Sequence, residues 1–337
     1  MGMVRFVIKR LMIIPPLLLV LTFLLFLCLH LAPGDPAEML ADPMLVSDEE
    51  YLDSVRKAYG LDQPVYIQYS RWLIGWPGPD PQYLENIPEK YREHYTSNIP
   101  KGILWGNFGR SWKHESISRV IMERLPVTLE LTILALLMAI GMGLLLGIVA
   151  ALKRGAIADY LSTTGALFGL SMPSYWLGMM MILIFAFRLG WMPPQYDGSF
   201  ISMLMPAIAL GAFHMASLAR MTRSSMLEVM GEDYIRTARV KGVSERVVIS
   251  KHGLKNALIP IITILVLQIP WLVGGAVVLE RVFRIPGMGT LLIDSIYPHA
   301  DPYVVLAIFL VLSVLTVFAN LLADILYAYV NPKIRYG

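Results

Sequence analysis

The side chains that most often carry enzyme chemistry are scattered along this 337-residue sequence. A zinc-binding helix needs two histidines four positions apart, and none of the six histidines has that spacing. The segment Gly169-Leu-Ser171-Met-Pro173 lacks the second glycine of a nucleophile elbow. The dipeptide Gly-Lys, which a phosphate-binding loop requires, does not occur. We therefore expect a chain that is not an enzyme and binds no cofactor or metal ion of its own.

Charged residues gather in one segment, 220–256, which holds eight basic and four acidic residues. The stretch Met226–Lys241 has apolar positions near helical spacing, Gly242 ends this helix, and Ser244 begins a second one. We expect Gly242 to adopt positive φ and Ala238 to lie on the apolar side of the first helix. This pattern fits an amphipathic helix on anionic lipid and a docking surface for a soluble partner equally well.

The elements that must position this segment are membrane helices. Hydrophobic residues make up 56% of the chain and charged residues 16%, against about 45–50% and about 25% in soluble domains. The net charge of +3 is too small to indicate nucleic-acid binding. A spanning helix needs about 20 mostly apolar residues. Six runs meet this requirement and predict an all-α integral membrane protein with six transmembrane helices: Leu11–Ala32, Val127–Leu152, Leu161–Phe187, Ile201–Ala219, Ala257–Leu279 and Tyr303–Val330.

Four of the polar or helix-breaking residues inside these runs are candidates for a role in transport or in helix packing: Ser171, Pro173, His214 and Gln268. Polar groups inside a membrane are functional candidates by default, so these four could line a transport pathway. Helix packing explains them as well, and for His214 and Gln268 we favour a hydrogen bond between helices. Two small-residue patterns, Gly143-x-x-x-Gly147 and Gly165-x-x-x-Gly169, predict close helix contacts.

The distribution of lysine and arginine predicts the orientation. With six spans, one side holds both termini and 15 basic against six acidic residues, and the other holds 13 basic against 19 acidic residues. Both termini should therefore be cytoplasmic. The predicted domains are a cytoplasmic N-terminus with the first helix (1–32), an extracytoplasmic segment (33–126), a five-helix transmembrane domain (126–330) containing the cytoplasmic loop 220–256, and a cytoplasmic tail (331–337). In the external segment, Ser47 is expected to cap a helix that ends at Gly60.

The cytoplasmic loop resembles that of ABC-importer permeases. Their signature is Glu-Ala-Ala, three residues, Gly and a downstream Leu-Pro-like pair; here Arg236-Thr237-Ala238, Gly242 and Ile259-Pro260 occupy these positions. Its departures from the general signature fit the oligopeptide/dipeptide branch. Other stretches are similar to that branch and span the chain: Gly106–Ser111, Glu123–Glu130, Ser171–Gly178, Arg188–Pro193 and Glu280–Gly289. The segment 78–102 fits less well and resembles an insertion.

The resemblance implies a type I ABC importer permease, specifically the first (B-type) permease of a peptide importer in the prokaryotic cytoplasmic membrane. Such a subunit pairs with a second homologous permease and with two ATPase subunits, which bind ATP and Mg²⁺. An extracytoplasmic substrate-binding protein delivers the cargo. The loop between spans four and five docks on the ATPase, which favours the docking interpretation here and assigns that contact to Tyr234, Arg236, Thr237, Ala238, Lys241, Gly242, Ser244 and Glu245.

Other functions stay open at this point. Relatives of similar architecture carry oligosaccharides or nickel chelates instead of peptides, although a nickel path should show clustered histidines. A secondary transporter would need charged or discontinuous helices in mid-membrane. The first, third, fourth and fifth runs contain no Asp, Glu, Lys or Arg, which argues against it. A structural assembly protein is the third alternative.

Overall fold

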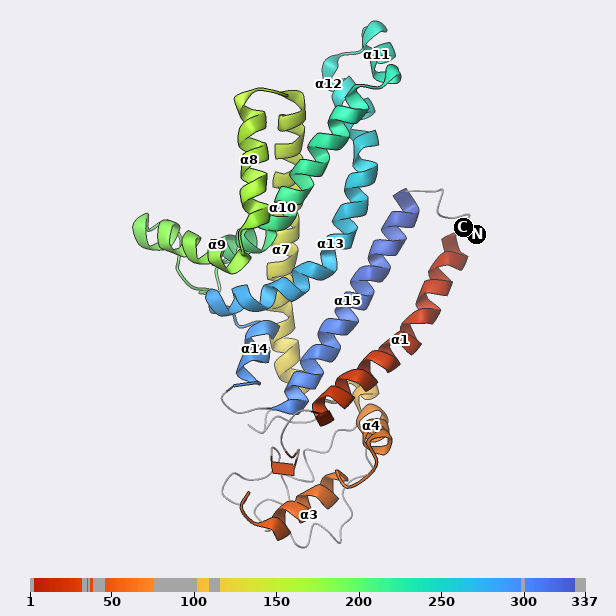
Figure 1. The fold of residues 1–337 in the computed structure, drawn as a ribbon, viewed down its shortest axis with the longest axis vertical. Coiled ribbons are helices and arrows are strands. Elements are labelled where there is room, and N and C mark those ends of the chain that lie inside the picture. The colour runs from red at the N-terminus through yellow and green to blue at the C-terminus, as the bar shows by residue number, and fades with distance from the viewer. Residues whose placement is uncertain are drawn as a thin grey trace. The chain divides into compact units, whose positions relative to one another are not determined.

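The computed structural model describes residues 3–31, 35, 37–38, 46–75, 102–108, 116–297 and 301–330. The secondary structure of these residues is built from helices (Figure 1), which confirms the all-α prediction for this part of the chain. Most of the predicted insertion, residues 78–101, lies outside the described residues, as does the predicted tail 331–337.

Among the helices that the structure describes, four are long and apolar enough to cross a membrane: α1 (Met3–Leu31), α7 (Ile117–Leu152), α10 (Phe200–Met230) and α15 (Pro302–Val330). They cover the first, second, fourth and sixth predicted runs. Helix α13 (Lys255–Val282) covers the fifth run. By length and composition, the described helices thus support four spans, or five if the bent helix pair of the next paragraph counts as one span. The count of six spans stays a prediction.

The third predicted span is not one continuous helix. Helix α8 (Ile157–Ser171) ends before Pro173, and a second segment, made of α9 (Ser174–Met181) and the π-helix η2 (Ile182–Arg188), continues at an angle of 112°. Met172, which joins them, is extended with φ −90° and ψ 131°. Proline disfavours helical geometry in the residue before it and lacks the backbone N–H that helix continuation needs. Pro173 therefore converts the predicted helix into a broken span or a re-entrant pair.

Glycines allow α7 and α8 to approach α10 closely. A Cβ on Gly147 would lie 2.5 Å from Thr222 Cβ and 2.6 Å from the Ala219 carbonyl oxygen. Gly143 and Gly169 likewise face α10, whereas a Cβ on Gly165 would meet no atom within 4 Å. The prediction of close packing is thus confirmed for the first small-residue pattern and for only one glycine of the second.

The chain divides into two compact units. The first comprises residues 1–12, 127–290 and 315–337, and the second comprises residues 13–126 and 291–314. The core of the first unit joins α7, α9, α10 and α13 through fully buried side chains such as Leu131, Met203, Leu279 and Phe283. Every site discussed below lies in this unit.

The second unit contains the described part of the predicted external segment: α3 (Glu49–Tyr59), α4 (Val65–Ile74) and the short 3₁₀ helix η1 (Ile103–Trp105). Asp48, not Ser47 as predicted, caps α3, because its carboxylate accepts hydrogen bonds from the backbone N–H groups of Glu50 and Tyr51. Gly60 ends the helix in the left-handed conformation, as expected. Helix α4 packs on α1, where the hydroxyls of Tyr69 and Thr22 lie 2.8 Å apart.

Candidate functional site

The segment between α10 and α13 extends beyond the ends of the neighbouring helices of its unit (Figure 1). It consists of α11 (Asp233–Val240), α12 (Glu245–Val247) and the π-helical η3 (Val248–Leu254), which continues directly into α13. Helix α10 runs past its predicted end to Met230, so the helix predicted over Met226–Lys241 is two helices, divided at residues 231–232. The predicted second helix after Gly242 is confirmed, and it is continuous with the fifth run.

A small apolar core holds this loop together. Ile235 and Val248 are completely buried and Ala238 is 8% exposed, with Met230 and Val243 packed against them. Ala238 therefore lies in the interior of the loop, and its expected place on an exposed docking face is wrong. The physical reason is that α11 folds back onto η3, so the apolar side of α11 covers the loop's own second helix. The core fixes α11 relative to the start of α13.

The turn after α11 depends on Gly242. Gly242 has φ +75°, a left-handed conformation that confirms the expected positive φ. Its N–H donates to the Arg239 carbonyl at 3.0 Å, and the Val243 N–H donates to the Ala238 carbonyl at 3.2 Å. This pair of hydrogen bonds is a Schellman motif, in which the residue after the glycine also packs on the end of the helix. Val243 makes that apolar contact.

A charged pair bridges the turn. The Arg239 guanidinium donates from Nε and Nη2 to the two carboxylate oxygens of Glu245, at 3.2 and 2.8 Å. The Arg239 guanidinium lowers the pKa of the Glu245 carboxyl below its usual value, because it stabilises the ionised form. Ser244 is at the N-cap position of α12, where its backbone carbonyl accepts from the Val247 and Val248 N–H groups. The predicted residues Ser244 and Glu245 thus shape the turn.

The outer face of α11 is exposed and mixed in character. Val240 is 89% exposed, an unusual position for an apolar side chain, and Tyr234 is 42% exposed. Arg236, Thr237 and Lys241 also lie on the surface. The Tyr234 hydroxyl accepts a hydrogen bond from Asn256 Nδ2 at 3.0 Å, which ties the face to the first turn of α13. An exposed face with apolar, aromatic and arginine side chains is suited to a protein contact.

The loop is packed onto both adjoining helices. A Cβ on Gly253 in η3 would lie 3.1 Å from Met230 Sδ and 3.6 Å from Met226 Cε. Met226 on α10 and Ala257 and Ile261 on α13 are buried in one shared cluster. A force on α11 therefore has a continuous packed path into α10 and α13.

An ion pair that the sequence analysis did not single out lies near the same end of α10. The Arg223 guanidinium donates to both carboxylate oxygens of Asp159, at 2.6 and 2.8 Å, and joins α10 to the first turn of α8. The Gly155 N–H also donates to Asp159. The two residues are 64 positions apart, so sequence spacing carried no signal for this pair.

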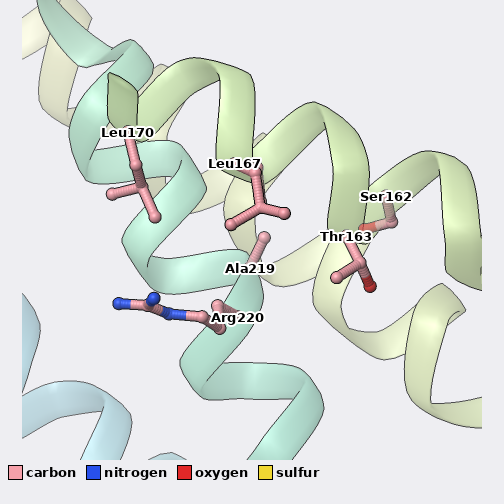
Figure 2. A pocket seen from close by; sticks show the side chains of 7 residues that line it. Ser162, Thr163, Leu167, Leu170, Ala219 and Arg220 are labelled. Atoms are coloured by element: carbon pink, nitrogen blue, oxygen red, sulfur yellow. The ribbon is translucent and has the colours of Figure 1, made fainter. Parts of the chain in front are cut away.

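One turn before Arg223, Arg220 borders a small groove between α8 and α10. The groove has a volume of about 30 Å³ and is lined by Ser162, Thr163, Ala166, Leu167, Leu170, Ala219 and Arg220. Figure 2 shows the Arg220 guanidinium on the side of Leu170, away from the two hydroxyl residues. Among the described residues, Arg220 has no ion-pair partner. It is an exposed cation in a helix that is apolar enough to span a membrane.

The four candidates in the apolar runs do not form one site. Ser171 donates its hydroxyl to the Leu167 carbonyl of its own helix at 2.9 Å, and Pro173 makes the break between α8 and α9. His214 on α10 is buried and hydrogen-bonds Gln268 on α13, while its Nδ1 has no partner. The His214–Gln268 contact agrees with the interpretation of these residues as a link between helices.

The fold and the site together define a multi-pass helical membrane protein with a protruding loop packed onto its membrane helices. The family described as "Binding-protein-dependent transport system inner membrane component" matches residues 143–336, and the N-terminal region of such membrane components matches residues 3–78. The chain belongs to this family and is a permease subunit of an ABC importer. The family's proteins are inner-membrane components that work with ATPase and binding-protein partners.

Curated relatives match over the full length. The chain is 40% identical to the glutathione transport system permease protein GsiC of Escherichia coli strain K12, over 99% of this chain and 100% of the relative. It is equally similar to GsiC of Salmonella typhimurium, with the same coverage. Among solved structures, an inward-facing MetNI methionine ABC transporter has a TM-score of 0.52 at 19% identity, over 63% of this chain and 96% of that chain. That similarity supports the type I permease fold alone.

Proposed function

We propose that α11 and the Gly242 turn dock on an ATPase subunit and couple its motion to the membrane helices. The observation that carries this proposal is the division of α11 into two faces. Its inner face, with Ile235 and Ala238, is buried in the loop's own core, and its outer face, with Tyr234, Arg236 and Val240, is exposed. A rigid, exposed face on a packed support is what a mechanical contact requires.

We also propose the orientation that this contact needs. The protruding loop carries eight basic and four acidic residues over 220–256, and an excess of basic residues marks cytoplasmic loops. Both termini would then be cytoplasmic, residues 33–126 extracytoplasmic, and residues 126–330 the shared transmembrane domain. In a Cys28→Ala background, a cysteine at Ser244 should react with an impermeant thiol reagent only after the cells are opened. Labelling of intact cells would refute this orientation.

The mechanism that follows is alternating access. This permease would form half of a translocation pathway with a second homologous permease. ATP and Mg²⁺, bound by two ATPase subunits, would close the ATPase dimer and displace the docked loops. The packed cluster of Met226, Ala257 and Ile261 would pass that displacement to α10 and α13. An extracytoplasmic binding protein would supply the cargo.

The cargo that we propose is a peptide. The similarity to GsiC supports this class, since its name assigns it glutathione, a tripeptide with free carboxylates. Arg220 is compatible with this class, because its exposed guanidinium, at the end of α10 next to the loop, can bind the free carboxylate of a peptide that leaves on that side. Neutral oligosaccharides offer no such charge. Nickel chelates would favour clustered histidines, and the described residues contain no such group of metal-ligating side chains.

The coupling proposal is tested by changing the outer face without touching the core. Val240→Asp places a charge at the most exposed apolar position of α11, and Val240→Thr is the matched control of nearly the same shape. We expect Val240→Asp to release the ATPase subunits during purification of the complex and to abolish uptake, while Val240→Thr retains both. Full ATPase binding and wild-type uptake with Val240→Asp would refute docking through this face and favour a lipid-surface helix.

The cargo proposal is tested on the partner binding protein. Its affinity should be measured by calorimetry for glutathione, short peptides, oligosaccharides and a nickel chelate. We expect binding of at least one peptide and of no sugar. Tight binding of an oligosaccharide alone would refute the peptide class and leave the coupling proposal intact.

A further inference from the structure

A buried carboxylate lies at the end of α13 opposite the loop, and the proposed function does not use it. Glu280 is 0% exposed. Its Oε1 accepts from the Thr128 hydroxyl of α7 at 2.6 Å, and its Oε2 accepts from the backbone N–H groups of Gly289 and Thr290 at 2.7 and 3.1 Å. The Thr128 hydroxyl oxygen in turn accepts from the Met288 N–H at 2.8 Å. These hydrogen bonds join α7, α13 and the start of α14 (Met288–Asp294).

Two glycines make this arrangement sterically feasible. A Cβ on Gly287 would lie 2.4 Å from the Glu280 carboxylate, and a Cβ on Gly289 would lie 2.4 Å from Val277 Cα. The backbone of the Gly287–Gly289 segment therefore rests directly on α13. A buried charge is costly unless it is hydrogen-bonded, so the backbone donors and the Thr128 hydroxyl explain how Glu280 is tolerated. The carboxylate fixes the backbone in return.

The turn Phe283–Gly287, which leads into this segment, also forms hydrogen bonds with the loop before α10. The Tyr196 N–H donates to the Phe283 carbonyl at 2.9 Å, and Arg284 Nη1 donates to Gln195 Oε1 at 3.3 Å. Phe283 is completely buried, and its ring would lie 2.9 Å from a Cβ on Gly178. The turn is thus fixed by α7, α9, α13 and the loop before α10.

This turn contains a strained residue. Arg284 has φ +53°, and among the described residues it is the one position other than glycine with positive φ. Strained backbone persists only where the surroundings enforce it, and such residues cluster at functional sites. The Arg284 side chain is exposed, and so is Trp191 in the neighbouring loop. The turn and its hydrogen bond to Gln195 therefore hold an exposed cation in a fixed conformation.

We propose that the turn Phe283–Gly287 is a contact surface for the extracytoplasmic binding protein, and that Glu280 is its positioning residue. Glu280 acts through the backbone of residues 288–290, and Arg284 makes the contact. This inference rests on the proposed function, because the turn is extracytoplasmic only if α11, at the other end of α13, faces the ATPase. Among charged residues, arginine is the one enriched in protein interfaces and their hot spots, so an exposed arginine on a preorganised backbone fits a soluble protein as the partner.

The experiment distinguishes the contribution of the Arg284 side chain to the contact from the contribution of the backbone conformation of the turn. Arg284→Gly removes the contact but suits positive φ, so this variant should fold at least as well as the natural chain. Thr128→Val removes the hydroxyl that binds Glu280 and Met288, and Thr128→Ser retains it. Each permease is purified with its second permease and ATPases, reconstituted in vesicles and assayed for uptake at increasing concentrations of loaded binding protein.

We expect Arg284→Gly and Thr128→Val to raise the half-saturating concentration of binding protein by about tenfold, which corresponds to about 1.4 kcal/mol. Basal ATPase activity and ATPase co-purification should not change, and Thr128→Ser should behave as the natural chain. An unchanged half-saturating concentration with Arg284→Gly would overturn the contact. If Thr128→Val lowers the maximal uptake rate and the thermal stability but leaves the half-saturating concentration of binding protein unchanged, Glu280 has only a structural role. Failure of the docking proposal would appear separately, as ATPase subunits that remain bound to Val240→Asp.

Discussion

Substitutions at Gly242 test whether coupling depends on the direction of α11. A Cβ at Gly242 would meet no atom within 4 Å, so a side chain there has ample space. A substitution at this position is instead unfavourable for the backbone, because φ is +75°. A residue with a Cβ is about 1–2 kcal/mol less stable in the left-handed conformation. A change of that size alters the ratio of correctly and incorrectly placed α11 by a factor of about 5 to 30. Asparagine tolerates this conformation best and β-branched residues worst.

We therefore expect uptake to fall in the order Gly242→Asn, Gly242→Ala, Gly242→Val, with the last close to inactive. The assay is ATP-driven uptake in vesicles, combined with the amount of ATPase that co-purifies with each permease. Gly141→Ala is the matched control, since Gly141 also has open space around it but lies within the helix α7 at ordinary φ. The strain argument fails if all three Gly242 variants transport equally well, or if Gly242→Asn is as damaging as Gly242→Val.

Three further predictions concern the surroundings of the loop. Gly147→Val should lower the free energy of unfolding by about 1–3 kcal/mol through overpacking against α10 and so lower the melting temperature of the complex. Gly165→Ala should leave the melting temperature unchanged. Equal effects of the two substitutions would contradict the packing. The Glu245 carboxyl has a lowered pKa, so its pairing with Arg239 supports the turn above the usual carboxyl range and is lost as the pH falls through the lowered pKa. Protection of the turn amides from hydrogen exchange should therefore drop only in acid, and Glu245→Gln should remove that dependence; an acid drop that persists in Glu245→Gln would contradict it. Arg220→Gln should raise the half-saturating concentration for uptake of peptides with a free carboxylate about tenfold and leave that of amidated peptides unchanged. The control Arg223→Gln, which breaks the ion pair with Asp159, should mainly reduce thermal stability. Equal losses of uptake for both kinds of peptide in Arg220→Gln would exclude a carboxylate contact.

The sequence predicted those features that depend on local composition. Runs of about 20 apolar residues identified α1, α7, α10 and α15, because bilayer thickness imposes a length that composition alone reveals. Gly242 was predictable as a helix end for a similar reason, since the conformational freedom of glycine is a property of the single residue. The Gly143 and Gly147 pair faced a helix as expected, because small residues at this spacing leave room for a backbone.

Features that depend on distant parts of the chain were missed or misplaced. Ala238 was expected on a docking face, but the sequence could not show that Val248 would cover it. The break at Pro173 lies inside a run without charged residues. A hydropathy average over such a run does not register a single proline, although that proline interrupts the helix. The Asp159–Arg223 pair and the Glu280–Thr128 contact join residues 64 and 152 positions apart. Such partners become visible only when the helices are placed side by side.

Helix α13 connects the two regions to which we assign function. At its first end it is continuous with η3, which is packed against α11 through Val248 and against α10 through Gly253. At its other end Glu280 fixes the turn that precedes α14 and binds Thr128 of α7. A displacement of α11 that moves the start of α13 must therefore either move the Glu280 end or bend the helix between them. Because close packing resists small continuous deformation, we infer that the loop and the turn switch together, and that binding at either end biases the same two arrangements of α13.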